Sequence, residues 1–167
     1  MRILVTQSQI AQRVKELAAE ITKYYDGEPL TVIVLMNGAM IFAADLVREI
    51  KLPLRWEAFS CSSYENDSSS GRLKVRSELK NPVTDRHLLI VDDVLDRGFT
   101  LLKVTEFFKN LGPLSVRTCV LLNKNVSGRS FSKPDWTGFV IPDHYVVGYG
   151  LDSNEEWRNL PYIAVKE

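Results

Sequence analysis

Two continuous apolar runs constrain the fold of this chain more than any other feature of its sequence. Residues 30 to 36 read LTVIVLM, and residues 88 to 91 read LLIV. Neither run alternates apolar with polar residues, as a strand with one face in water would. Such runs are typical of strands that are buried on both faces, in parallel sheets covered by helices.

Helical patterns lie between the strand-like runs. In residues 8 to 25, Ile10, Val14, Leu17 and Ile21 fall on one stripe, and Ser8 is placed to cap the helix. Further helices are expected at residues 39 to 50 and 100 to 110, and further strands at residues 54 to 62, 73 to 77, 115 to 123, 137 to 142 and 145 to 149. This alternation predicts an α/β fold with a mostly parallel central sheet flanked by helices.

Composition excludes several classes of protein. The 167 residues suit one domain, residues 1 to 167, and Lys plus Arg equals Asp plus Glu at 21 each. We therefore expect no nucleic-acid partner, and no membrane partner, because the apolar runs are too short to cross a bilayer and MRILVTQSQI lacks signal-peptide features. Cys61 and Cys119 are expected as reduced thiols in a cytoplasmic protein. His87 and His144 have no partner at metal-ligand spacing.

Residues 87 to 102, HLLIVDDVLDRGFTLL, join a buried strand to a helix. Ligands of open α/β sheets bind at the carboxyl ends of the strands, where this stretch lies. Gly98 permits a tight turn, so that the amides of residues 97 to 100 can face one anion at the helix N-terminus, and Thr100 adds a hydroxyl. The stretch predicts a phosphate cradle, although it lacks the spacing of a Walker A loop.

Three carboxylates beside a phosphate site need a role of their own. Asp92 and Asp93 can accept hydrogen bonds from the vicinal hydroxyls of a ribose, or hold Mg2+ through oxygen. Asp96 lies between the sugar site and the cradle, where a general base would stand. These groups together indicate a phosphorylated ribose as ligand. The structural alternative is a solvated acidic turn that caps the following helix.

VDDVLDRGFT resembles the phosphoribosyl pyrophosphate (PRPP) motif of the type I phosphoribosyltransferases, and in particular of the hypoxanthine-guanine phosphoribosyltransferases. The similarity extends over residues 8 to 165. It implies the type I phosphoribosyltransferase fold, with a small C-terminal hood and a flexible lid loop. It also implies that PRPP is bound by Arg97, Gly98, Phe99 and Thr100, where Arg97 and Phe99 replace the family's common Thr and Lys.

Two further segments resemble parts of the family's PRPP site. LMNGAMIFAADL, residues 35 to 46, matches a turn that binds diphosphate through Met36, Asn37 and Gly38, with a cis peptide bond between the first two. Asn37 stands where the family often has Lys or Arg. SSYENDSSSG, residues 62 to 71, matches the lid, and implies that Ser63 and Tyr64 close over PRPP.

The remaining segments resemble the family's purine site. In LLNK, Lys124 matches the lysine that donates to the 6-oxo group of the base. In residues 138 to 165, the resemblance implies that Tyr145 stacks on the purine, that Val146 presents its backbone to the ring edge and that Asp152 lies near the exocyclic position and the metal. Arg158 then approaches the diphosphate.

The resemblance implies a purine-salvage transferase that makes IMP and GMP from PRPP and hypoxanthine or guanine. It implies Asp96 as the general base at purine N7, and Mg2+ as cofactor on Asp92, Asp93 and Asp152. A homodimer or homotetramer is expected. Two alternatives remain open at this point: a PRPP- or nucleotide-sensing regulatory protein, and a phosphoribosyltransferase that prefers xanthine.

Overall fold

A five-stranded parallel sheet forms the centre of the structure, a computed structural model that describes residues 1–63, 73–131 and 133–167. The strand order is β3-β2-β6-β7-β8, and every neighbouring pair is parallel. Its strands are β2 (Leu30–Leu35), β3 (Leu54–Phe59), β6 (His87–Leu95), β7 (Ser115–Lys124) and β8 (Trp136–Ile141). The predicted α/β fold with a parallel central sheet is confirmed.

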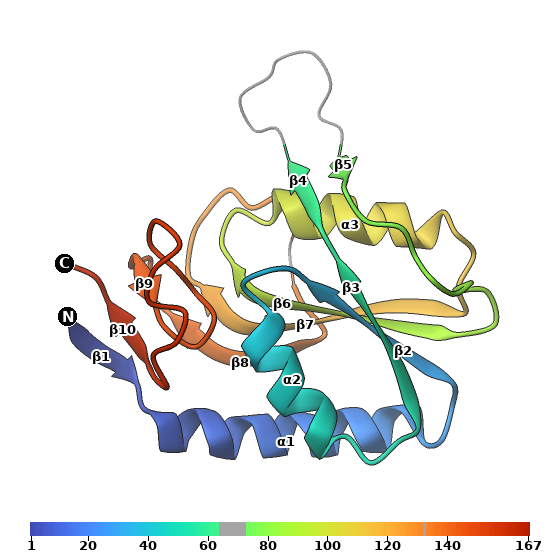
Figure 1. The fold of residues 1–167 in the computed structure, drawn as a ribbon, viewed down its shortest axis with the longest axis horizontal. Coiled ribbons are helices and arrows are strands. Elements are labelled where there is room, and N and C mark those ends of the chain that lie inside the picture. The colour runs from blue at the N-terminus through green and yellow to red at the C-terminus, as the bar shows by residue number, and fades with distance from the viewer. Residues whose placement is uncertain (64–72, 132) are drawn as a thin grey trace.

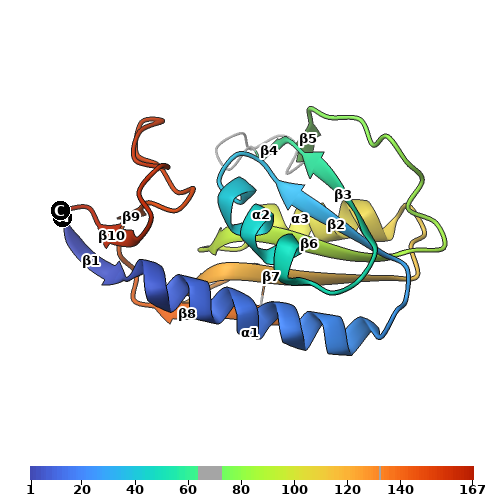
Figure 2. The ribbon, with the colours of Figure 1, turned by 60° about the horizontal axis from the view of Figure 1, so that its bottom comes forward.

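Helices cover both faces of this sheet (Figures 1 and 2). One face packs against α1 (Gln7–Tyr25) and α2 (Met40–Glu49), and the other packs against α3 (Phe99–Lys109). Every residue of β2 is buried, which explains why that strand is apolar apart from Thr31. The stripe predicted for α1 faces the core, since Ile10, Val14, Leu17 and Ile21 are all buried.

The N-terminus of α1 is capped by a different residue from the one predicted. Thr6, not Ser8, is the cap: its hydroxyl accepts from the Gln9 amide, and the Gln9 side chain accepts from the Thr6 amide. Such a capping box satisfies two amides at once, which a serine inside the first turn cannot do. The sequence order Thr-Gln-Ser-Gln contains this signal, and the prediction of Ser8 was wrong.

Strand β6 is longer than predicted, and this places the carboxylates inside it. Asp92 and Asp93 were expected to follow the strand, but β6 runs on to Leu95. The reason is the length of β7, which pairs with β6 as far as Leu95 opposite Asn123, whereas β2 pairs with β6 only as far as Val91. Residues 92 to 95 therefore have a strand neighbour on one side only.

A second, three-stranded antiparallel sheet stands at one end of the molecule and holds both chain ends (Figure 1). Its order is β1 (Arg2–Val5), β10 (Ile163–Val165) and β9 (Val146–Val147). We call this sheet the hood. Strands β1 and β10 were not predicted, and the strand expected at residues 145 to 149 shrinks to two residues, because Gly148, Tyr149 and Gly150 all have positive φ.

Strands β4 (Cys61–Ser63) and β5 (Leu73–Val75) form an antiparallel pair beside α3. The predicted lid, including Tyr64, lies almost wholly outside the described residues. Cys61 and Cys119 are free thiols, as expected. Within the described ranges, no helix combines the length and the apolar character that crossing a bilayer requires.

Tyr25, the last buried residue of α1, has a polar atom that the fold does not use. Its side chain is 2% exposed and packs against Tyr24, Trp136 and His87, with ring centroids 5.0 to 6.1 Å apart. Its hydroxyl has no hydrogen-bond partner among the described residues. Burial raises the pKa of Tyr25 far above its ordinary value, so the group stays neutral. The ring stabilises the fold, and the hydroxyl does not.

We therefore predict that Tyr25→Phe leaves the free energy of unfolding unchanged or raises it by up to about 2 kcal/mol, because an unsatisfied buried hydroxyl is removed without loss of ring packing. Urea unfolding followed by circular dichroism measures this. Leu17→Ala, at a side chain with 0% exposure, is the control and should lose about 2 to 5 kcal/mol. A loss above about 1 kcal/mol for Tyr25→Phe would show that the hydroxyl has a partner.

Candidate active site

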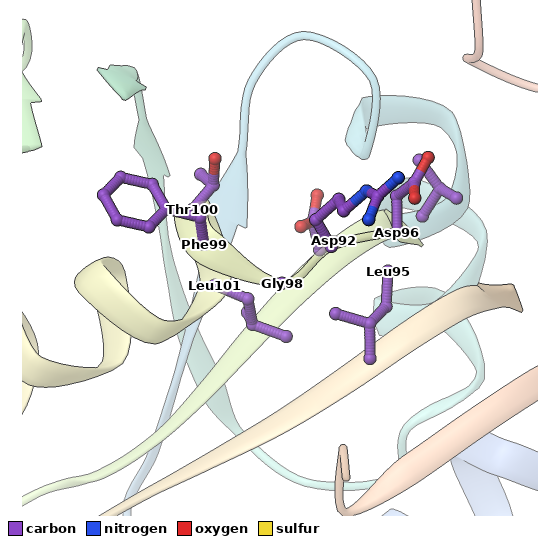
Figure 3. A pocket seen from close by; sticks show the side chains of 9 residues that line it. Asp92, Leu95, Asp96, Gly98, Phe99, Thr100 and Leu101 are labelled. Carbon is purple, nitrogen blue, oxygen red and sulfur yellow. The ribbon is translucent and has the colours of Figure 1, made fainter. Parts of the chain in front are cut away.

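The loop between β6 and α3 forms a cavity at the carboxyl end of the sheet. About 210 Å3 in volume, it is lined by Asp92 and residues 94 to 101 (Figure 3). Gly98 is the N-cap of α3, with φ of +83°, and no side chain caps the helix. The first turn of a helix leaves backbone N–H groups without partners inside the helix. This uncapped N-terminus is therefore suited to an anion, as the sequence predicted.

Contacts with a later segment hold the cradle in shape. The Ser130 amide donates to the Arg97 carbonyl at 2.9 Å. A Cβ atom on Gly98 would lie 2.7 Å from Phe131 Cβ and 2.9 Å from the Phe131 backbone nitrogen. Glycine is thus required at position 98 twice, by its left-handed backbone and by the close approach of Phe131.

The two departures from the family's cradle, Phe99 and Arg97, differ in their contacts. The Phe99 ring is directed away from Asp92 and Asp96 (Figure 3), and the Lys103 ammonium lies 5.8 Å from the centroid of that ring. The ring of Phe99 therefore contacts a cation on its own helix and is not turned toward the two aspartates. Arg97 is exposed and forms no ion pair with any side chain in the described part of the chain. Its charge remains available to the cavity that its backbone lines.

Asp92 and Asp93 lie side by side in the half-paired part of β6. Burial raises the pKa of the Asp92 carboxyl well above its ordinary value, and the neighbouring charge of Asp93 raises it further. Burial also raises the pKa of Asp93, while Arg158 opposes that rise. Cys61 is near enough for Asp92 to matter: burial first, and then Asp92, raise the pKa of the Cys61 thiol to about 11. Within the described residues, no positive charge lowers the pKa of Asp92, and Arg158 only partly offsets the rise at Asp93.

The predicted diphosphate turn folds directly onto Asp93. The Met36–Asn37 peptide bond is cis, as the family resemblance implied. A Cβ atom on Gly38 would lie 1.8 Å from Asp93 Oδ2, so only glycine allows the turn to approach that carboxylate. A Cβ atom on Gly150 would lie 2.2 Å from the Gly38 carbonyl oxygen. The turn is thus enclosed between β6 and the segment that follows β9.

Arg158 is brought to the same place by that segment. Its Nη1 donates to the Gly150 carbonyl at 2.8 Å, and its Nη2 lies 3.0 Å from Asp152 Oδ1. Asp152 also accepts the Glu155 amide at 2.9 Å, and Glu155 lies 3.0 Å from Arg158 Nη2. The structure therefore brings together Gly38, Asp93, Asp152 and Arg158, all four of which were predicted as site residues.

A second group forms where β6 and β7 end. The Lys124 ammonium donates to Asp96 Oδ2 at 2.9 Å and to Asp143 Oδ1 at 3.4 Å. The Lys124 side chain is only 11% exposed, so its charge is directed by these two carboxylates and not by water. Asp96 and Lys124 were assigned to catalysis and to base binding on separate motifs. Their pairing puts a hydrogen-bond acceptor and a donor side by side.

Tyr145 directly precedes β9, two residues after Asp143 in the sequence. Its ring is 57% exposed, and its hydroxyl donates to the Asp152 carbonyl at 3.4 Å. Val146 is buried and pairs with Val165 in the hood. An exposed aromatic ring held at its hydroxyl end is a surface on which a flat ligand can stack. Ser63 ends β4, and Tyr64 lies outside the described residues.

Within the described residues, no three or more His, Cys, Asp or Glu side chains are gathered as a metal site. Asp92, Asp93 and Asp152, which were predicted to hold a metal, do not form a cage of their own. Mg2+ usually takes one or two carboxylates and completes its shell with water and substrate oxygens. The desolvated oxygens of Asp92 and Asp93 have the chemistry that such an ion requires.

Several residues that complete the site were missed from the sequence. Asp143 contacts Lys124, Gly150 contacts the Gly38 turn, and Phe131 contacts Gly98. Two glycines around one tyrosine, in GYG, signal a tight backbone approach. Asp143 follows Pro142 in an ordinary turn pattern, and no local signal distinguishes it from a solvated acid.

Comparison with known proteins finds one matching family and several relatives. Residues 3–154 match the phosphoribosyl transferase domain family. The chain is 41% identical to a hypoxanthine-guanine phosphoribosyltransferase of Bacillus subtilis, over 98% of this chain and 92% of the relative. It is 34% identical to a hypoxanthine-guanine-xanthine phosphoribosyltransferase of Tritrichomonas foetus, over 98% and 90%.

Solved structures show the same fold. A hypoxanthine phosphoribosyltransferase of Staphylococcus aureus superposes with a TM-score of 0.95 at 33% identity, covering 100% of this chain and 91% of that one. A hypoxanthine-guanine phosphoribosyltransferase of Bacillus anthracis, with HEPES in its active site, gives 0.94 at 35% identity, with coverage of 100% and 99%.

The cradle generates a prediction with a matched control. Gly98→Ala should weaken the binding of inorganic phosphate at least about tenfold, because the new methyl group displaces the Phe131 backbone and with it the amides of the cradle.

Gly112, at the other end of α3, has φ of +76°, and a Cβ atom added there would meet nothing within 4 Å. Gly112→Ala should cost about 1 to 2 kcal/mol of stability and leave phosphate affinity unchanged. Calorimetric titration and urea unfolding give both quantities, and equal phosphate affinity in the two variants would contradict the assignment of the cradle.

Proposed function

The chain belongs to the hypoxanthine-guanine phosphoribosyltransferases, a family of transferases, and from this premise we propose that it makes IMP and GMP from PRPP and the free bases hypoxanthine and guanine. The reaction joins purine N9 to the anomeric carbon of the ribose and releases diphosphate. The salvage of purine bases is the role that follows.

The pairing of Lys124 with Asp96 is the observation that carries this proposal. In a 6-oxopurine, N7 and the 6-oxo group lie on one edge of the ring, so they need an acceptor and a donor placed side by side. The Lys124 ammonium and the Asp96 carboxylate are 2.9 Å apart. An ammonium has three donors. Asp96 and Asp143 take two of them, which leaves one for the oxo group of the base.

The same pair explains why adenine is a poor fit. Lysine offers donors only, whereas the 6-amino group of adenine is itself a donor. A donor that faces a donor in a partly desolvated site leaves both groups unpaired, which is costly. Tyr145, exposed beside Asp152, offers the face on which the purine ring stacks, and the Val146 backbone borders the opposite edge of the base.

PRPP is proposed to span the two groups of residues. Its 5-phosphate occupies the cavity at residues 96 to 100, where Arg97, Gly98, Phe99 and Thr100 supply backbone groups. Asp92 and Asp93 accept hydrogen bonds from the ribose hydroxyls. The contact of Gly38 with both Asp93 and Gly150 supports this placement, because it puts the diphosphate turn next to the ribose site.

The diphosphate is proposed to lie between the turn at Met36, Asn37 and Gly38 and the guanidinium of Arg158. Arg158 is suited to this, since it is always charged and presents several donors. It now pairs with Asp152 and Glu155, and those partners orient it toward the turn. The lid residues Ser63 and Tyr64 are proposed to cover this side.

Mg2+ is proposed as cofactor, held by Asp92, Asp93 and Asp152 together with oxygens of PRPP and water. The raised pKa of Asp92 and of Asp93 supports it, because two adjacent desolvated carboxylates whose negative charge is only partly compensated favour a divalent cation. When bound, the ion neutralises charge that develops on the departing diphosphate.

Asp96 is proposed as the catalytic base. Its carboxylate, oriented by Lys124, accepts the proton from purine N7 while N9 attacks the anomeric carbon. The C–O bond to diphosphate breaks, and the configuration at that carbon inverts. Asp92 and Asp93 hold the ribose while positive charge develops on the ring, and Arg158 holds the leaving group.

Compartment and assembly complete the proposal. The two free thiols, Cys61 and Cys119, support a reducing cytoplasm. A homodimer or homotetramer is proposed as the assembly, as the resemblance of the sequence to the family implies. The chain is proposed to act as one domain, since its two apolar clusters lie on opposite faces of one sheet.

The first prediction from this proposal concerns the reaction and its base. Purified protein with PRPP and Mg2+ should form nucleotide from hypoxanthine and guanine, and not from adenine or uracil, and EDTA should stop the reaction. Asp96→Asn should lower kcat by about 100-fold to 10,000-fold, the contribution of a general base. Asp85→Asn, the same change in the exposed turn before β6, should keep full activity.

Other outcomes separate the alternatives. Nucleotide from xanthine at a higher kcat/KM than from hypoxanthine would assign a xanthine preference, which the Tritrichomonas foetus relative makes worth measuring. PRPP binding without nucleotide formation from any base would overturn the proposal in favour of a regulatory protein.

The second prediction concerns selectivity. Lys124→Gln removes the charge but keeps an amide that can both donate and accept. It should lower kcat/KM for hypoxanthine by about 10-fold to 100-fold, as expected for a hydrogen bond from a charged group, and lower that for adenine much less. Lys15→Gln, on the exposed face of α1, is the control. Equal losses of kcat/KM for hypoxanthine and adenine would show that Lys124 does not determine which base is used.

A further inference from the structure

Tyr149 occupies a backbone conformation that tyrosine rarely adopts. Its φ is +52°, and the glycines on either side, Gly148 and Gly150, each have φ of +102°. A left-handed conformation is uncommon for a bulky residue and persists only where its surroundings enforce it. Tyr149 is only 6% exposed, so its side chain is held in place in the interior.

The hydroxyl of Tyr149 reaches across to α2. It donates to Asp45 Oδ2 at 2.5 Å, and Asp45 forms an ion pair with Arg48 one turn further along the helix. Burial, and then the hydrogen bond to Asp45, raise the pKa of Tyr149 far above its ordinary value. The hydroxyl is therefore a donor throughout the neutral range, and it is directed at a carboxylate.

The two residues of this hydrogen bond lie on segments that carry the proposed diphosphate site. On one side, the Tyr149 amide donates to the Leu160 carbonyl at 2.8 Å, and the Gly150 amide donates to the Arg158 carbonyl at 2.9 Å. On the other side, α2 begins at Met40, directly after the turn that contains Gly38. Gly150 and Gly38 themselves are in contact. The Tyr149 side chain thus connects the segment that carries Arg158 to the helix that carries the turn.

We propose that Tyr149 is a positioning residue for diphosphate: its hydrogen bond to Asp45 fixes the separation between Arg158 and the Gly38 turn, and so sets the affinity for the diphosphate group of PRPP. This inference rests on the proposed function, in which those two elements hold that group. Tyr149 touches neither substrate, and it acts through Arg158 and Gly150.

Ring packing alone does not explain a hydroxyl in this position. Tyr25 is as deeply buried as Tyr149, and its hydroxyl has no partner among the described residues. This fold therefore accommodates a buried tyrosine ring without using its polar atom. The Tyr149 hydroxyl, by contrast, donates a hydrogen bond to Asp45 on α2. Tyr149 itself lies in the segment after β9, so this bond joins two separate parts of the fold.

The test compares the same substitution at the two buried tyrosines. Tyr149→Phe should raise KM for PRPP and Kd for magnesium diphosphate about tenfold, while KM for hypoxanthine changes less than about twofold, because one hydrogen bond to a charged group is lost on the diphosphate side. Tyr25→Phe should leave all three values unchanged. Steady-state kinetics and calorimetric titration with magnesium diphosphate provide the readouts.

Substitutions at Asp45 test the same hydrogen bond from its other end, and they remain informative even where Tyr149→Phe folds poorly. Asp45→Asn keeps an oxygen that accepts from the hydroxyl, and should preserve most of the diphosphate affinity. Asp45→Ala removes the acceptor and should match Tyr149→Phe. The double variant, Tyr149→Phe with Asp45→Ala, should then be no worse than either single variant, because both remove one interaction.

Contrary outcomes are distinct from failure of the enzyme assignment. A lower Tm in Tyr149→Phe with unchanged KM for PRPP and unchanged diphosphate Kd would reduce the hydrogen bond to a structural role and overturn the inference. Additive losses in the double variant would also overturn it. Absence of nucleotide formation by the wild-type protein would instead overturn the proposed function, and the diphosphate titration would still decide the role of Tyr149.

Discussion

The unequal reach of neighbouring strands is the constraint on which the site depends. Strand β2 pairs with β6 only to Val91, whereas β7 pairs with it to Leu95. Four residues of β6 therefore have an open flank at the point where β2 turns away into α2. Asp92 and Asp93 occupy this flank, and the Gly38 turn enters it. A sheet with strands of equal length would satisfy the backbone of β6 on both sides and leave no room for the turn.

Charge is distributed unevenly in a chain that is neutral as a whole. At the carboxyl edge of the sheet, Lys124 is shared between Asp96 and Asp143, and Arg158 is shared between Asp152 and Glu155. Each of these two cations is thereby held between two carboxylates, and each of the four carboxylates has a cation as its neighbour. Asp92 has no such neighbour in the described residues, which is why burial dominates its titration.

The sequence predicted the elements whose patterns are local and missed those that depend on pairing. The apolar runs identified β2 and the centre of β6, and the stripe identified α1. The end of β6 was placed too early, because nothing within DDVL reveals that β7 continues alongside it. Strands β1 and β10 are short, have ordinary composition and are defined by pairing between segments far apart in the sequence.

The same distinction applies to the site. Gly98 and the three aspartates of VDDVLDRG are recognisable because they lie close together in one stretch that joins a strand to a helix. The contact of Lys124 with Asp143 and that of Tyr149 with Asp45 join residues 19 and 104 positions apart. Such contacts follow from the fold, so a single sequence contains no local pattern that announces them.

The hood has a consequence for the order in which the protein is built on the ribosome. Arg2 pairs with Val165, and the neighbouring strand β10 pairs in turn with β9, which follows Tyr145. All five strands of the central sheet have been synthesised once Ile141 is added. The five strands of the central sheet can therefore pair with one another before the hood is complete. The hood forms only when β10 emerges and pairs with β1, which was synthesised well over a hundred residues earlier.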